Sequence, residues 1–292
     1  MKIYKKGRKS IEQCEYFCSN CTNCRSLEQA VLYLRQMRRI LLGIYAAVLI
    51  SCIPSEKHPE SEKMTLIGKA EKAHSKRDFL ANEVMQFDIV LEFGGTERLN
   101  GAMALATNSS KGRISYKNGR ELYYDHERVF ASPELENTGG ARFAAYTWSY
   151  FFLFPYKLSD PGTNWSASEV DTLKGQPYHS QRLTFEKGVG DAPDDWYISY
   201  FNTETNLIEA AAYIVTAGET TVEEAEENPH AISYHDYKDV DGIALAHSWK
   251  FWEWRKDSGL TRQLGKAELS NFQFLTDEEA SLNPPENFIE IE

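Results

Sequence analysis

The sequence predicts an α+β domain in which a strongly curved antiparallel β-sheet of about ten strands forms a half-barrel around one or two helices. Three observations predict this fold. From Met85 onward, apolar and polar residues mostly alternate, which is the period of half-buried strands. Short turn sequences separate the strands, so that neighbours run antiparallel. One segment rich in aromatic residues, 141–156, interrupts the strands with a helix, and a twisted sheet curls around such an element.

A short helix is predicted before the sheet and a β-meander after it. Met64, Ile67, Ala70, Ala73 and His74 share one helical face, and this helix is expected to end before Asn82. Strands follow at 85–93, 99–105, 114–116, 122–124 and 129–130. Gly94-Gly95 ends the first of them, and Asn118-Gly119 is a strong hairpin signal between the third and the fourth.

The aromatic segment 141–156 is the first candidate for ligand binding. Its aromatic residues cover every side of a helix, so the helix should be enclosed on most sides. Two interpretations follow: the helix fills the concave face of the sheet as core, or it forms a lid over an apolar ligand cavity. The residues that would then contact a ligand are Trp148, Phe151, Phe152 and Phe154.

The second half returns to strands, at 183–185, 196–200, 207–215, 232–234, 243–254 and 264–274, with a short acidic helix at 220–228. Both faces of the strand 243–254 are aromatic, with Trp249 on one face and Trp252 and Trp254 on the other. One face can serve the core, whereas the other needs a cover, a partner or a ligand. The three tryptophans are therefore further ligand-binding candidates, and coverage by 220–228 or by the C-terminal tail is the alternative.

An export signal is predicted near the N-terminus. Arg38 and Arg39 precede an unbroken apolar run, 40–50, which is too short to span a bilayer and is typical of a signal peptide. Leu49-Ile50-Ser51-Cys52 resembles the lipobox of bacterial lipoproteins. That resemblance implies cleavage before Cys52, diacylglycerol on its thiol, and anchorage to a membrane. No cysteine follows Cys52, so disulfides play no part in the predicted fold.

The remaining domain boundaries follow from composition. Residues 1–36 carry Cys14, Cys18, Cys21 and Cys24 and precede the signal peptide 37–51. They are interpreted as an extension from a start codon placed too far upstream, with an unstructured leader or a metal site as alternatives. Residues 52–63 are expected to form a flexible tether, 64–276 the single half-barrel domain, and 277–292 an acidic tail.

Charge excludes one class of partner. Residues 1–51 hold nine basic and three acidic residues, a net charge of +6, and the rest of the chain holds 23 basic and 40 acidic residues, a net charge of −17. An acidic domain repels nucleic acid, so no nucleic-acid partner is expected.

Two resemblances to known families extend this interpretation. The residues 197–200, 202–207 and 232–243 resemble a pattern of lipoprotein-carrier-like domains. This implies a half-barrel closed by helices around a hydrophobic cavity that can hold acyl chains. The phrases 93–101, 146–152, 155–162 and 190–197 resemble an uncharacterised lipoprotein family of Bacteroidota, which implies relatives and a compartment but no activity.

Signals for catalysis and metal binding are weak. Asp191, Asp194 and Asp195 lie in one loop and could hold Ca²⁺ through their oxygens, although an acidic turn explains them as well. No His-Glu-x-x-His or Gly-x-Ser-x-Gly motif occurs, and no pair of carboxylates identifies a glycosidase. No cofactor is predicted.

The sequence therefore predicts a lipid-anchored protein of the cell envelope without catalytic activity, which binds a hydrophobic ligand such as a lipid or an acyl chain. Two other functions remain open. The first is an envelope scaffold or protein-interaction module, whose exposed aromatic face would be the interface. The second is an enzyme acting on glycans, which would use the acidic loop and exposed tryptophans.

Overall fold

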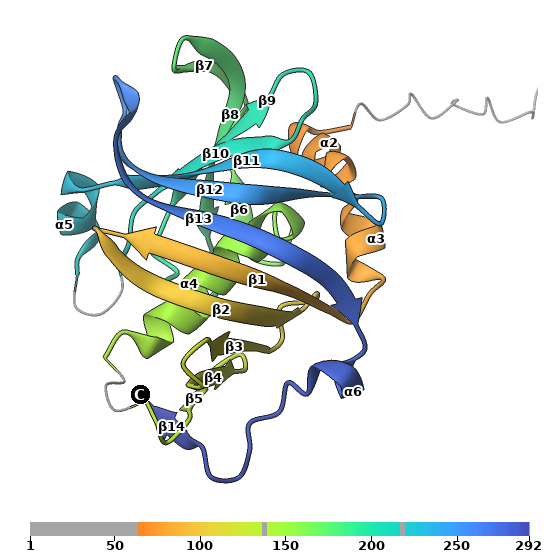
Figure 1. Ribbon diagram of the computed structural model, residues 1–292. Helices are drawn as coiled ribbons and strands as arrows, with labels where there is room; N and C mark the ends of the chain where they lie inside the picture. The colour runs from red at the N-terminus through yellow and green to blue at the C-terminus, as the bar shows by residue number, and fades with distance from the viewer. Residues whose placement is uncertain (1–63, 136–138, 217–219, 292) are drawn as a thin grey trace, which may run out of the picture. The chain divides into compact units, whose positions relative to one another are not determined.

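The computed structural model describes residues 64–135, 139–216 and 220–291, which belong to one compact unit, Met64–Glu292. Residues 1–63, including the predicted anchor at Cys52, lie outside the described part. Within that part, fourteen strands form an antiparallel sheet in the order β14-β5-β4-β3-β2-β1-β13-β12-β11-β10-β9-β8-β6, and β7 also pairs with β8 (Figure 1). The predicted fold class, a curved antiparallel sheet with a few helices, is confirmed.

The strands of the first half are β1 (Val84–Phe93), β2 (Thr96–Ala106), β3 (Gly112–Tyr116), β4 (Glu121–Tyr124) and β5 (Val129–Ala131). Those of the second half are β6 (Thr163–Trp165), β7 (Glu169–Leu173), β8 (Gln176–Phe185), β9 (Tyr197–Asn202), β10 (Ile208–Tyr213), β11 (His230–Val240), β12 (Ile243–Arg255), β13 (Gly259–Leu275) and β14 (Ile289–Ile291). The sequence analysis missed β6, β7 and β14, which have three to five residues each and show no clear period.

Tight turns join neighbouring strands. Gly94 and Gly95 both have positive φ, at 63° and 74°, which a two-residue hairpin turn between β1 and β2 requires. Asp241 and Gly242 form a similar two-residue turn between β11 and β12, with φ of 53° and 84°. These turns keep adjacent strands antiparallel. Within each strand, the pleat of the backbone makes alternate residues face the same side. In β1, for example, the inward residues are buried and Asp88 on the outer side is exposed.

The helix α4 (Ala141–Leu153) lies on the concave side of the sheet, behind β1, β2 and β13 in Figure 1. Its aromatic side chains contact distant strands: Phe152 stacks on Phe87 of β1 with ring centroids 4.3 Å apart, and Phe151 lies 5.0 Å from Tyr213 of β10. The sheet therefore wraps around the helix. Pro155 lies just beyond the end of α4, in the 3-10 turn η1 (Phe154–Tyr156). Together α4 and η1 cover residues 141–156, where the sequence predicts a helix.

Two short helices pack at the carboxyl end of α4, where the sequence predicts one. They are α2 (Leu66–Ala73) and α3 (Lys76–Leu80), and Ser75 between them has a φ of 53°, which interrupts the helix. The Phe79 ring of α3 stacks 3.7 Å from the ring of Tyr156.

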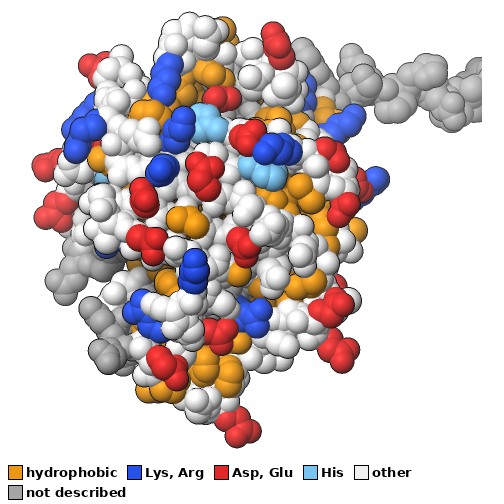
Figure 2. All heavy atoms as spheres, viewed as in Figure 1, with side chains coloured by type: hydrophobic (Ala, Val, Ile, Leu, Met, Phe, Trp, Pro, Cys, Tyr) orange, Lys and Arg blue, Asp and Glu red, His pale blue; other side chains and the backbone are white. Residues whose placement is uncertain are grey.

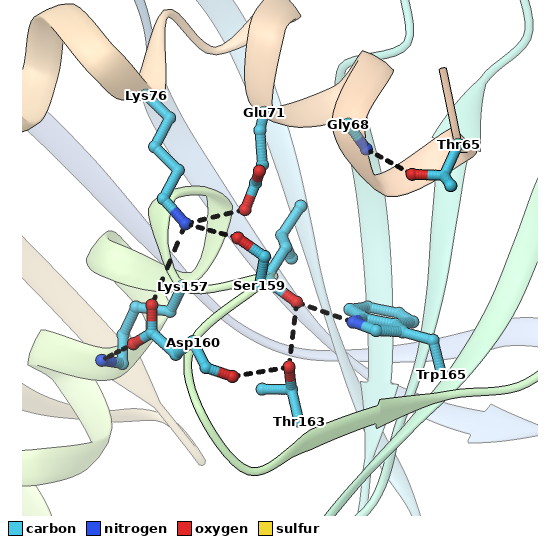
Figure 3. A network of polar contacts seen from close by, with 10 residues as sticks. Thr65, Gly68, Glu71, Lys76, Lys157, Ser159, Asp160, Thr163 and Trp165 are labelled. Atoms are coloured by element: carbon cyan, nitrogen blue, oxygen red, sulfur yellow. Dashed lines mark hydrogen bonds and ion pairs between the residues drawn. The ribbon is translucent and has the colours of Figure 1, made fainter. Parts of the chain in front are cut away.

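Polar contacts hold these helices to the loop that follows η1, as Figure 3 shows. The Lys76 ammonium donates to a Glu71 carboxylate oxygen at 2.7 Å and to the Ser159 hydroxyl at 3.0 Å, and it lies 3.9 Å from Asp160. Asp160 also pairs with Lys157 at 2.5 Å. This end of the half-barrel is closed by packing and by charge.

The outer side of the sheet carries two more coverings. The helix α5 (Val222–Glu227), which the sequence predicts at 220–228, begins with a capping box between Thr221 and Glu224. It packs against an outer apolar cluster whose residues come mainly from β9 to β12, with one each from β7 and β13. The helix α6 (Asp277–Ala280) covers Val84 and Ala104, and β14 pairs with β5. On the face seen in Figure 2, acidic and basic side chains are interspersed.

Candidate functional site

A cavity of about 560 Å³ lies beside the amino-terminal half of α4. This volume falls within the range of about 300–1,000 Å³ that is typical of small-molecule sites. Fifteen residues line it, and ten of these are apolar or aromatic: Phe93, Tyr116, Leu122, Leu135, Ala141, Phe143, Ala144, Trp148, Tyr213 and Val215. The others are Arg98, Gly139, Gly140, Thr147 and His230.

The strand order explains why residues so far apart in sequence meet at this cavity. In an antiparallel meander, the last residues of one strand and the first residues of the next lie side by side, at the same end of the strands. The cavity is lined from three such junctions, which are β1 to β2, β3 to β4 and β10 to β11. The amino end of α4 completes the lining, whereas the 3-10 turn η1 that follows its carboxyl end packs against α2 and α3.

The inner wall of the cavity consists of packed rings. Trp148 is 7% exposed and makes edge contacts with Phe143 at 5.9 Å and with Phe251 at 5.8 Å. His230 stacks on Tyr213 with centroids 6.1 Å apart and an angle of 28° between the planes. Arg98, Gly139, Gly140 and Phe143 are exposed, and we call this side of the cavity the mouth.

Burial keeps the titratable groups of the wall neutral. It lowers the pKa of His230, and Glu253 opposes this with a smaller effect. It also raises the pKa of Tyr213 and of Tyr116, so both remain phenols at neutral pH. Arg98 is thus the one formally charged side chain among the fifteen lining residues. The site can accept apolar matter, with one cation at its mouth.

The structure places the ligand-binding candidates of α4 in two environments. Trp148 lines the cavity. Phe151, Phe152 and Phe154 are at most 5% exposed, belong to the main core and do not line this cavity. A second void, beside Phe152, has a volume of about 10 Å³, which is too small for more than a single water.

The tryptophans of β12 also separate. Trp249 is 1% exposed and lies in the main core. Trp252 and Trp254 lie in the outer apolar cluster beneath α5, where their indole N–H groups donate to the Ser233 hydroxyl at 2.8 Å and to the Tyr200 hydroxyl at 3.1 Å. The aromatic outer face of this strand is therefore covered by the chain itself, and neither of these two rings lines the large cavity.

A serine and a histidine lie together on the outer face of β11, but their geometry is structural. The Ser233 hydroxyl is 2.7 Å from His235 Nε2 and accepts from Trp252. Burial, together with the nearby charges of Lys250 and Lys174, lowers the pKa of His235 to about 4. Because Ser233 is only 1% exposed, its hydroxyl positions Trp252 and has no access to a substrate.

Two of the three aspartates considered for calcium, Asp191 and Asp195, have separate partners. Asp191 pairs with Arg142 at 2.6 Å, and one carboxylate oxygen of Asp195 accepts from the Thr216 N–H at 2.7 Å and from its hydroxyl at 2.8 Å. Burial raises the pKa of Asp195, and the bonds from Thr216 oppose that. In the described residues no group of three His, Cys, Asp or Glu side chains is arranged to hold a metal ion, so the geometry gives no support to calcium binding by Asp191, Asp194 and Asp195.

Among the fifteen lining residues, sequence reasoning identified only Trp148 as a ligand contact; those it missed include Phe93, Arg98, Tyr116, Tyr213 and His230. A signal was present, because each of them lies within two residues of a predicted turn or strand end. Every second turn of a meander lies at the same end of the strands. Counting the turns would therefore have shown that these residues lie at one end of the sheet.

Comparisons with known proteins show what part of the sequence and the fold are similar to. Residues 142–261 match the profile of a family of unknown function (DUF6503). The fold is similar to that of a LolA superfamily protein from Nitrosomonas europaea, with 9% identity, coverage of 72% of this chain and 96% of that chain, and a TM-score of 0.47. It is also similar to a DUF1329 family protein from Desulfovibrio piger, with 11% identity, coverage of 75% and 99%, and a TM-score of 0.41.

No curated protein is significantly similar in sequence to this chain. None of the helices in the described residues is long and apolar enough to cross a membrane.

Proposed function

We propose that the half-barrel binds a hydrophobic ligand, a lipid or an acyl chain, in the cavity beside the amino-terminal half of α4. The observation that carries this proposal is a cavity of about 560 Å³ whose lining is two-thirds apolar or aromatic and which opens at a mouth. Binding would shield an apolar chain from water, at about 0.8 kcal/mol for each buried CH₂ group. No covalent step and no cofactor is part of this function.

We further propose that the chain is a lipid-anchored envelope protein of the Bacteroidota, held by a diacylglycerol on Cys52 and exported by the signal peptide 37–51. Metabolic labelling with a radioactive fatty acid should then mark the parent chain and leave Cys52→Ala unlabelled. Translation started at Met37 should give the same labelled product, since residues 1–36 are dispensable in this proposal. Label that persists in Cys52→Ala would contradict the anchor.

Native mass spectrometry of the chain purified from a host membrane extract tests ligand binding. The parent chain should carry a co-purified apolar compound as an added mass. In Ala144→Trp, a large ring replaces a methyl group of the cavity wall and should exclude the ligand. A parent chain that is always empty and binds other proteins would favour the interaction module, and a bound sugar would favour the glycan enzyme.

A further inference from the structure

We propose that the ligand is a single-chain amphiphile with an anionic head, and that Arg98 binds this head at the mouth while the chain lies among the aromatic side chains inside. This inference rests on the proposed function, because it names the chemical class of the ligand in the same cavity. Carboxylate and phosphate heads share the required chemistry.

The backbone directs Arg98 away from the regular sheet. In the pairing of β1 with β2, Leu91 lies opposite Leu99 and Glu92 lies opposite Glu97, so Arg98 is the extra residue of a β-bulge. Bulges redirect a side chain and often occur at the rim of a curved sheet. The Arg98 Nε–H donates to the Phe93 carbonyl at 3.3 Å, which places the guanidinium beside the Gly94-Gly95 turn, at the mouth.

The charge of Arg98 is not compensated. No carboxylate of the described residues lies within ion-pair distance of its guanidinium, and its recorded hydrogen bond is to the Phe93 carbonyl. Some other arginines do have a carboxylate partner: Arg142 pairs with Asp191 at 2.6 Å, and Arg262 pairs with Glu253. A guanidinium whose remaining N–H groups are available can hold a carboxylate or a phosphate through two parallel bonds.

The position of the charge fits an amphiphile. Arg98 is exposed, whereas Trp148 and Tyr213 on the inner wall are 7% and 5% exposed. A charged head would thus stay in contact with water, and the apolar chain would be taken out of it. This avoids the cost of burying an unpaired charge.

The amino end of α4 adds the same sign at the mouth. Gly140, the residue before the helix, has no side chain to accept a bond from the first turn, and it lines the cavity. The first turn of a helix carries a partial positive charge. This field supports an anionic head, although the assignment depends on the cavity and on Arg98.

The test is isothermal titration of the whole chain at pH 8 with dodecanoate, dodecanol and dodecyl phosphate. Dodecanoate should bind roughly three- to tenfold more tightly than dodecanol, as expected for one charge-assisted contact near solvent. Arg98→Gln should remove this preference by weakening dodecanoate binding more than dodecanol binding, and Arg98→Lys, which keeps the charge but not the two parallel bonds, should retain part of it. The preference should also shrink in high salt. Whether dodecanoate or dodecyl phosphate binds better separates a free fatty acid from a phosphate-bearing lipid as the source.

Arg77→Gln is the matched control, because the Arg77 side chain is 93% exposed and lies on α3, at the opposite end of α4. It removes the same charge and should keep the preference. Equal binding of dodecanol and dodecanoate by the parent chain, or a preference that survives in Arg98→Gln, would overturn the inference and leave the proposed function standing. Failure of all three probes to bind would overturn the proposed function, and this inference with it.

Discussion

His74, the residue that ends α2, is fully buried at the closed end of the half-barrel. The Ile208 N–H donates to its Nε2 at 3.1 Å, which requires the neutral ring, with its proton on Nδ1. Burial lowers the pKa of His74 to about 3, and the backbone of Ala244 opposes this with a smaller effect. The folded state therefore resists protonation of this ring throughout the pH range in which the unfolded chain takes up a proton.

Stability should consequently depend on pH through His74. Below the ordinary histidine pKa of 6.5 the unfolded state binds a proton that the folded state does not, so this contribution is fully present above pH 6.5 and is lost as the pH falls toward 3. Between pH 7 and pH 5 it should lower the free energy of unfolding by about 2 kcal/mol. Urea unfolding at both pH values should show a smaller loss in His74→Gln than in the parent, and an equal loss would contradict this assignment.

At the scale of residues, the sequence predicts burial better than it predicts the site. Phe151, Phe152 and Trp249 are apolar residues at inward positions, and they are buried. A cavity, however, is space that side chains leave unfilled, so it depends on the packing of several strands at once. Period-two alternation places Phe93 on the inner face, but it does not show that Arg98 forms a bulge or that its charge lacks a partner.

At the scale of elements, α4 borders the cavity on one side and packs into the core on the other. Trp148 and Ala144 face the cavity, and Phe152 faces β1, where it stacks on Phe87 at 4.3 Å. The two interpretations of the aromatic segment are therefore both partly realised in the geometry: the carboxyl half of the helix fills the core, and the amino half borders the cavity.

Substitutions on the two sides of α4 should separate stability from binding. Phe152→Ala should lower the free energy of unfolding by about 3–5 kcal/mol, because a large buried ring is lost. The melting temperature should then fall by several degrees. Trp148→Phe keeps most of the apolar contacts of the wall. It should weaken binding of a fluorescent fatty acid and leave the melting temperature nearly unchanged. Unchanged affinity in Trp148→Phe, with lost affinity in folded Phe152→Ala, would place the ligand elsewhere.

The sequence locates several long strands with a clear period, and of the short strands it locates β3, β4 and β5 but not β6, β7 and β14. The strands β1, β12 and β13 have ten or more residues, and the sequence locates each of them, although β13 begins five residues before the predicted start. The strands β6 and β14 have three residues each, and they depend on neighbouring strands for their hydrogen bonds. Ser75, with its positive φ, interrupts a face that otherwise has helical spacing, which explains why one helix was predicted.

At the scale of the whole described unit, the two ends of the half-barrel differ. The end at α2 and α3 is filled by stacked rings and by the Lys76 contacts, while the other end holds the cavity. The sequence predicts a sheet curved around a helix because the order of strands and turns is local information. It does not predict which end is open, since that depends on contacts between segments as distant as Lys76 and Ser159.

The most direct test of the central claim, that this cavity holds an apolar ligand, is the ligand mass found by native mass spectrometry in two matched variants. Ala144→Trp fills the cavity, whereas Ala102→Trp adds the same ring on the outer face, beside Asp88. The account predicts added mass in the parent chain and in Ala102→Trp, and none in Ala144→Trp. Equal occupancy in both variants, or an empty parent chain, would contradict it.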